Sequence, residues 1–102
     1  MKFLNLLSNV TKATSKQKKQ ELWDVEGTLN NQLLKFDLRP LKNNVKRGSF
    51  KTKADKMVFD IKDQYIIVDV EELHQYLKNE SLKDVYLQDL LSKLEWNIIL
   101  PK

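Results

Sequence analysis

A run of apolar residues in the second half of the chain restricts the possible folds most strongly. Residues 65–68, Tyr-Ile-Ile-Val, are aromatic or β-branched and follow one another without a polar break. Such a continuous run predicts a central strand that is buried on both faces of a sheet. The short polar stretch 62–64 separates it from the strand-forming residues around Val58, which predicts a hairpin.

A second hairpin is predicted earlier in the chain. Apolar and charged residues alternate over residues 23–26 and again over residues 34–38. Asn30 and Asn31 stand between the two arms, and asparagine tolerates the positive φ angles of tight hairpin turns. Pro40 has no N–H to donate to a sheet, so the second arm should end there.

The first ten residues predict an amphipathic helix. Their apolar side chains follow the i, i+3, i+4, i+7 spacing of one helical face: Phe3, Leu6, Leu7 and Val10. The polar, lysine-rich residues 11–20 continue this helix as a basic extension of marginal helicity, since they have no apolar face.

Two further helices are predicted before the chain ends in a strand. Asp69 and Glu72 have the spacing of a capping box, which predicts a helix that ends near Asn79. Ser81 and Asp84 repeat the spacing of a capping box and predict the start of the next helix. Its apolar face follows the i, i+3, i+4, i+7 spacing: Leu87, Leu90, Leu91 and Leu94. Residues 95–100 predict a final strand that Pro101 stops.

The expected fold class is α+β in one domain over residues 1–102. It has a mostly antiparallel sheet of about five strands, made of two hairpins and a C-terminal strand. An N-terminal helix with its basic extension occupies residues 1–20, two helices precede the last strand, and helices pack mainly on one face. A basic loop, residues 40–56, joins the hairpins.

The composition limits the cellular compartments and the kinds of reaction that can be expected for this protein. The chain has no cysteine, which excludes disulfides and thiol chemistry and favours a cytoplasmic location. Polar residues interrupt the apolar N-terminus, so a signal peptide is not expected. No run approaches the roughly 18 apolar residues of a membrane span. The N-terminal helix could instead lie on an anionic membrane through Phe3, Leu4 and Leu7, but core packing is favoured.

The charge of the chain is strongly segregated. Residues 1–20 hold five basic residues and no acid, and residues 39–56 hold seven basic residues against one acid. Residues 57–102 hold five lysines against nine acids, and the whole chain has a net charge of +4. Two basic segments attached to a mildly acidic body indicate an anionic partner.

The basic loop is the main candidate site. Basic residues bind phosphates by releasing counterions, which needs no fixed geometry, and an aromatic residue among them can stack on an unpaired base. The predicted nucleic-acid contacts are Arg39, Lys42, Lys46, Arg47, Phe50, Lys51 and Lys53, joined by Lys12, Lys16 and Lys19 on one helical face if that helix folds near the loop. The alternative is a solvated loop with Phe50 folded onto the core.

One pattern of acidic residues is similar to that of metal-dependent nucleases. Asp55, Asp69 and Glu71 follow the order of an acid, a hairpin and a carboxylate pair, which suits Mg²⁺. The nuclease pattern ends in acid-x-Lys, but no lysine follows Glu71 at this spacing. Asp69 is also expected to cap a helix. His74 has no second histidine or cysteine for catalysis or metal binding. No catalytic residue, metal or cofactor is predicted, and the protein is not expected to be an enzyme.

The expected function is therefore that of a small binding protein. It engages nucleic acid, with single-stranded RNA or DNA favoured, or a ribonucleoprotein or other protein complex, through the basic loop. The aromatic-glycine pattern of common single-stranded RNA readers is absent. The alternative is a protein-binding inhibitor or adaptor that uses an edge strand, the acidic 69–89 face or the loop. The Lys-, Asn- and Leu-rich composition resembles that of phage and mobile-element accessory proteins, so such an inhibitor could block a nucleic-acid-handling defence enzyme. No membrane partner is expected, and the oligomeric state is left open.

Overall fold

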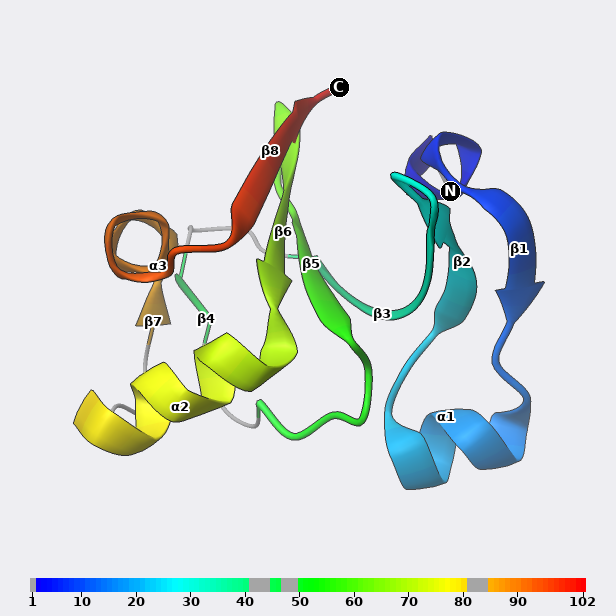
Figure 1. Cartoon of the computed structure of the whole chain (residues 1–102), viewed down its shortest axis with the longest axis horizontal. Coiled ribbons are helices and arrows are strands. Elements are labelled where there is room, and N and C mark those ends of the chain that lie inside the picture. Colours follow the sequence, from blue (N-terminus) through cyan, green and yellow to red (C-terminus); the bar gives the residue numbers. More distant parts are fainter. Residues whose placement is uncertain (1, 41–44, 47–49, 81–84) are drawn as a thin grey trace.

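The computed structural model describes residues 2–40, 45–46, 50–80 and 85–102. The larger elements run in the order η1, β1, α1, then β2, β3, β5, β6, then α2, α3 and β8 (Figure 1). Their bounds are η1 Lys2–Leu6, β1 Ser8–Lys12, α1 Ser15–Glu21, β2 Val25–Leu29, β3 Gln32–Pro40, β5 Lys56–Asp60, β6 Gln64–Asp69, α2 Val70–Glu80, α3 Leu87–Lys93 and β8 Asn97–Pro101. Two short strands, β4 Val45–Lys46 and β7 Val85–Tyr86, pair with each other.

The main sheet has six strands in the order β1-β2-β3-β5-β6-β8. Four of the five neighbouring pairs are antiparallel, whereas β3 and β5 run parallel, with Phe36 opposite Lys56. The α+β class is confirmed, but the sheet is mixed and has one strand more than expected. The extra strand is β1, in a segment that predicts a helix.

The parallel pair explains the length of the segment between the hairpins. Two parallel neighbours need a crossover of about a dozen residues or more, because the chain must return to the end of the sheet where it started. Residues 41–55 make this return, and their ends at Pro40 and Lys56 belong to paired strands. The length of the basic loop is therefore required by the sheet topology, whatever else the loop does.

Both predicted hairpins are confirmed. The first turns at Asn30 and Asn31, whose φ angles are 51° and 65°, and Leu29 pairs with Gln32 across the turn. In the second, β5 pairs with β6, and β6 lies between β5 and β8. All four residues of the apolar run 65–68 are buried, as its composition predicts.

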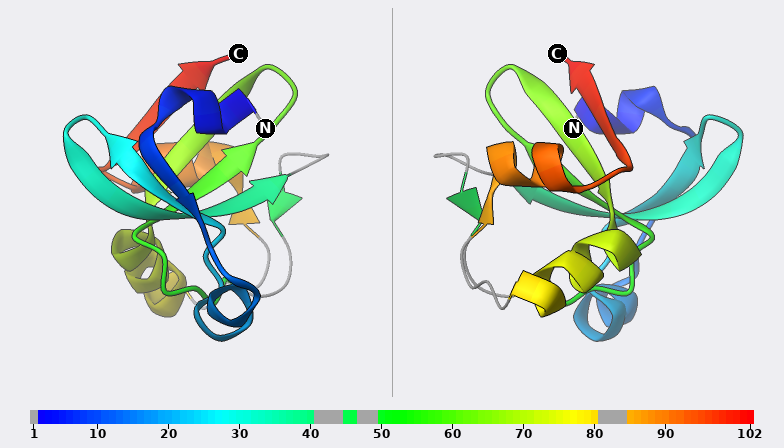
Figure 2. Two further views of the ribbon diagram at one scale, coloured as in Figure 1. Left: turned by 90° about the vertical axis from the view of Figure 1, so that its right-hand side faces the viewer. Right: turned by 60° about the vertical axis from the view of Figure 1, so that its left-hand side comes forward.

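The two faces of the sheet carry separate cores. Met57, Phe59, Ile66 and Val68 point to the face covered by α2 and α3, where they meet Leu73, Leu90 and their neighbours. The opposite face curls around η1 (Figure 2). There the ring of Phe3 packs edge-on against Phe36 and Tyr65, at centroid distances of 5.3 and 5.4 Å. Helices α2 and α3 thus share one face, and the other face is closed by η1 and the bent strands.

The predicted N-terminal helix is wrong in most of its length. Residues 2–6 form a 3₁₀ helix that buries Phe3 and places Leu7 in the core, but Leu6 and Val10 are exposed. Asn9 has a φ of 54°, and the register of β1 shifts between Ser8 and Thr11. A helix this short is marginal by itself, so pairing with β2 determines the conformation.

The C-terminal half contains the two predicted helices and the final strand, but the second helix begins later than predicted, at Leu87, because residues 85–86 form the short strand β7. Asp69 caps α2 by accepting a 3.0 Å hydrogen bond from the Glu72 N–H. The carboxylate of Glu72 accepts a hydrogen bond from the Trp96 N–H at 3.0 Å, so it ties α2 to the start of β8. The second capping pair, Ser81 and Asp84, lies outside the described residues. No helix within the described ranges is long and apolar enough to cross a membrane.

Candidate nucleic-acid interface

The fold brings the two basic segments together. The Lys53 N–H donates a 2.8 Å hydrogen bond to the Glu21 carbonyl, and the Thr52 hydroxyl donates one of 3.1 Å to the Leu22 carbonyl. The last part of the basic loop therefore lies along the end of α1. The sequence left open whether the two segments meet, because their contact spans about thirty residues.

Helix α1 is a separate helix and not an extension of the N-terminal one. Thr14 accepts a hydrogen bond from the Gln17 N–H at 3.1 Å, and the Gln17 side chain accepts one from the Thr14 N–H at 3.0 Å. This capping box has a Thr-x-x-Gln spacing that a search for helix starts would have found. Lys12 ends β1 ahead of the cap, so it does not share a helical face with Lys16 and Lys19 as predicted.

Four exposed lysines form what we call the basic surface: Lys16, Lys19, Lys51 and Lys53. Two acids lie near it, and both have other partners. Glu21 is 3.8 Å from the ammonium of Lys35 and accepts a hydrogen bond from the Trp23 indole. Asp24 is 3.3 Å from Lys18 and accepts a hydrogen bond from the Leu38 N–H. Glu21 and Asp24 thus have cationic partners outside the four lysines, which reduces the negative charge beside this surface.

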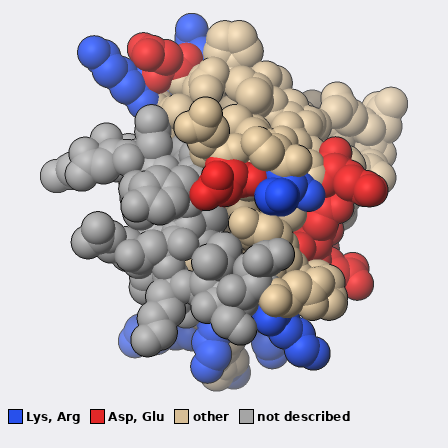
Figure 3. Space-filling view, turned by 90° about the vertical axis from the view of Figure 1, so that its left-hand side faces the viewer, with Lys and Arg blue, Asp and Glu red and all other residues tan. Residues whose placement is uncertain are grey.

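The charge segregation is visible on the molecular surface. In Figure 3, several Lys and Arg side chains lie along the lower edge, at the height of α1 in Figure 1, and Asp and Glu side chains gather on the right, while cations and acids lie side by side at the upper left and in the centre. The lower edge is thus the part of this face where cations predominate. This arrangement has the electrostatic character expected of a nucleic-acid-binding face.

Arg39 lies in the body of the protein and not in the loop. Its guanidinium binds both carboxylate oxygens of Asp37, at 2.6 and 2.8 Å, and also donates to the Lys51 carbonyl at 3.3 Å. The hydrogen bond with Asp37 raises the pKa of Arg39 above its ordinary value, against the opposing effect of burial. Asp37 is only 3% exposed, so the pair joins β3 to the end of the basic loop.

Phe50 takes the position that the alternative interpretation expected. It is 9% exposed and packs in the core under α2, and its carbonyl is 2.8 Å from Nε2 of His74. In this structure its ring is therefore not presented to a base. Lys42 and Arg47 lie outside the described residues, and so does the side chain of Lys46.

A small hollow opens beside the basic surface, and the sequence did not indicate it. Its volume is about 230 Å³, and its walls are mostly apolar. It is bordered by the end of α1, by the last part of the basic loop and by α2: Gln20, Glu21, Leu22, Lys51, Thr52, Lys53 and His74. The hydrogen bonds at Glu21 and Leu22 hold two of its walls together.

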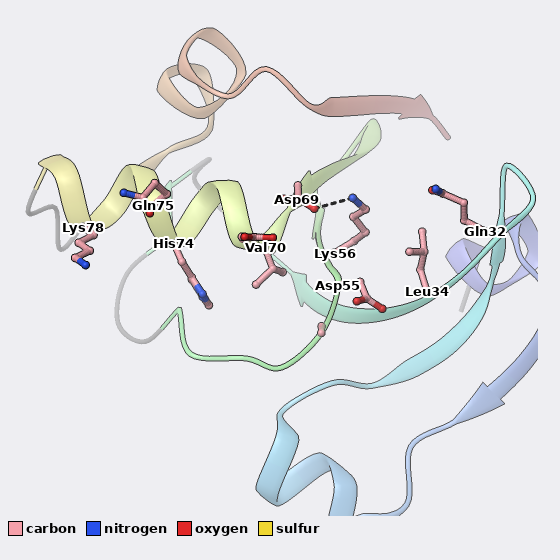
Figure 4. A pocket seen from close by; sticks show the side chains of 11 residues that line it. Gln32, Leu34, Asp55, Lys56, Asp69, Val70, His74, Gln75 and Lys78 are labelled. Atoms are coloured by element: carbon pink, nitrogen blue, oxygen red, sulfur yellow. Dashed lines mark hydrogen bonds and ion pairs between the residues drawn. The ribbon is translucent and has the colours of Figure 1, made fainter.

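A larger, polar pocket of about 570 Å³ lies between α2 and the start of β3 (Figure 4). Asp55, Asp69 and Glu71, the three acids of the nuclease pattern, all line it. Asp55 accepts a 2.8 Å hydrogen bond from the Lys35 N–H, which ties the loop to β3. Across the described ranges, no three His, Cys, Asp or Glu side chains are arranged to hold a metal ion.

An ion pair lies among the residues that line this pocket. The Lys56 ammonium lies 2.8 Å from Asp69 and 3.8 Å from the centroid of the Trp96 ring. Burial would raise the pKa of Asp69, but hydrogen bonds from Lys56 and from the Glu72 N–H outweigh it, and the pKa is below its ordinary value. Asp69 thus combines two structural roles, as a helix cap and as the partner of a nearly buried lysine.

Comparison with protein-family models, with curated proteins and with solved structures found no match. The geometry and charge of the molecule are therefore the only guides to its function.

Proposed function

We propose that the protein binds nucleic acid through the basic surface, with single-stranded RNA or DNA as its preferred ligand. The observation that supports this proposal is the backbone hydrogen bond between Lys53 and Glu21, which brings two lysine-bearing segments side by side although they are distant in the sequence. The proposed contacts are Lys16, Lys19, Lys51 and Lys53, with Lys12, Lys42, Lys46 and Arg47 as further candidates. Arg39 and Phe50 leave the set of contacts because both are occupied in the body of the protein.

The lysines are suited to this role by their chemistry and placement. Each exposed ammonium neutralises a phosphate and releases a counterion, which favours binding without fixed geometry. They project from a helix and from a segment held by backbone hydrogen bonds, so the row of charges is positioned before any ligand arrives. A cytoplasmic location and a non-enzymatic role belong to the same proposal, and a protein partner is an outcome of its test.

The test is fluorescence anisotropy with labelled single strands of RNA and DNA, titrated over a series of salt concentrations. Single strands are expected to give a slope of log K against log salt of about −0.7 per phosphate neutralised. The variant Lys16→Gln, Lys19→Gln, Lys53→Gln should therefore bind more weakly, and its slope should be shallower by about 2. Lys51 is kept, so this variant loses three charges.

A matched control loses the same number of charges elsewhere. Lys62, Lys78 and Lys93 are also exposed and lie away from α1, in the β5–β6 turn, on α2 and on α3. Their triple exchange to Gln should leave both affinity and slope close to those of the unmodified protein. Equal losses in the two variants, or no binding at low salt, would overturn the proposal and direct attention to a protein partner.

A further inference from the structure

We infer that the hollow beside Leu22 holds one unpaired base of the bound strand, an inference that rests on the proposed function. It assigns the stacking role to a place other than Phe50. The geometry brings an apolar recess and two of the phosphate-binding lysines together, since Lys51 and Lys53 line the hollow themselves. A strand whose phosphates lie on these lysines has a base within reach of the recess.

The conformation of Leu22 is the first argument. It follows α1 with φ 63° and ψ 23°, a left-handed conformation that glycine and asparagine usually adopt at this position. A leucine there is strained, and its side chain is 39% exposed. Packing into the core does not explain this residue, whereas an apolar wall for a ligand does, because strain of this kind often marks binding sites.

The other walls of the hollow suit a flat heterocycle. His74 contributes an imidazole whose Nε2 is held 2.8 Å from the Phe50 carbonyl, so the ring is fixed in place. Histidine is among the side chains on which splayed bases stack. Gln20 adds an amide at the rim, which can donate to and accept from the edge of a base.

The size of the hollow selects a single base. Pockets for drug-sized ligands typically measure about 300–1,000 Å³, and this one, at about 230 Å³, is smaller. A duplex keeps its bases stacked inside the helix, so it could use the lysines but not the recess. The occupant is therefore a base of a single strand or of an unpaired end.

The experiment compares probes and variants in the same anisotropy titration. An abasic strand of equal length carries the same phosphates, and we expect it to bind about fivefold or more weakly than the normal strand. The exchange Leu22→Gly should lower affinity for the normal strand by a similar factor. It should not change the salt slope, because no charge is removed, nor the affinity for a duplex.

Leu22→Gly is expected to fold, because glycine adopts this conformation without strain. Leu22→Asn, which suits the same φ angle, serves as a second variant. The control is Leu33→Ser, which removes another exposed leucine, 61% accessible, on β3 near the hairpin turn. This control should bind every probe like the unmodified protein.

The outcomes separate the two proposals. If the lysine variant flattens the salt slope but the abasic strand and both Leu22 variants bind normally, the base site is wrong and the basic surface remains. If no probe binds even at low salt, the proposed function fails and the base site fails with it. Loss of affinity in Leu33→Ser equal to that in Leu22→Gly would also overturn the base site.

Discussion

Arg39 and Asp37 stand two positions apart on β3 and form a two-point ion pair, with nitrogen–oxygen distances of 2.6 and 2.8 Å. Arg39, a predicted nucleic-acid contact, is thus a residue of the sheet. A further hydrogen bond of Arg39, to the Lys51 carbonyl, holds the other end of the loop against β3. The pair closes the crossover between β3 and β5 and positions the segment that carries the basic surface.

Exchange of Arg39 should therefore affect stability more than binding. Arg39→Gln leaves the nearly buried Asp37 without its guanidinium, and we expect the free energy of unfolding to fall by about 3 kcal/mol. Arg39→Lys keeps the charge but not the two-point geometry, so its loss should be smaller. Urea unfolding followed by tryptophan fluorescence measures both. A variant of normal stability with a flattened salt slope would instead make Arg39 a phosphate contact.

The ion pair between Lys56 and Asp69 should make stability depend on acid pH. The pKa of Asp69 is lowered in the folded protein, so its contribution is present above the ordinary carboxyl pKa of about 4. It is lost as the pH falls through the lowered value. Asp69→Asn keeps a helix-capping side chain, so the exchange mainly removes the charge, and we expect a loss of about 1–2 kcal/mol at neutral pH.

The measurement is the difference in unfolding free energy between the two proteins as a function of pH. This difference should be largest near neutrality and should shrink below about pH 4. Glu95→Gln, an exchange at an exposed acid, is the control and should give a small difference. If the difference in unfolding free energy between Asp69→Asn and the unmodified protein stays constant down to pH 2, the carboxylate charge is not the cause of this difference.

Gly27 and Leu7 should depend on each other. A Cβ at position 27 would lie 3.0 Å from both Cβ and Cδ1 of Leu7 and 3.4 Å from the Ser8 carbonyl. We therefore expect Gly27→Ala to cost about 1–3 kcal/mol through overpacking of β2 against Leu7. Leu7→Ala should cost about 2–4 kcal/mol by leaving a cavity.

The double variant should cost clearly less than the two single ones together, because the smaller side chain at position 7 makes room for the new methyl group. Thermal or urea unfolding of the four proteins gives this coupling. Strict additivity would show that the clash is relieved elsewhere, for example by a shift of β1.

Local patterns allowed much of the fold to be predicted. Asn30 and Asn31, the apolar run 65–68 and the Asp69 cap each act within a few residues, and each is found in its predicted role. The helix predicted over residues 3–10 failed because its pattern is short and ambiguous. The burial of Phe3 and Leu7 is compatible with a long α-helix as well as with the observed 3₁₀ helix and strand, so their pattern does not distinguish the two. The pairing of β1 with β2, which does, is a contact between separate segments of the chain.

The positive charge of the candidate site could be predicted from the sequence, but the arrangement of its residues in space could not. The sequence by itself determined that two segments are basic, that the body is mildly acidic and that hairpins build the sheet, since all of this follows from local composition and spacing. Only the tertiary structure decided that Lys53 meets Glu21, that Arg39 reaches the Lys51 carbonyl and that Phe50 is buried. These contacts depend on the parallel pairing of β3 with β5, whose stability comes from cores that residues distant in the chain build together.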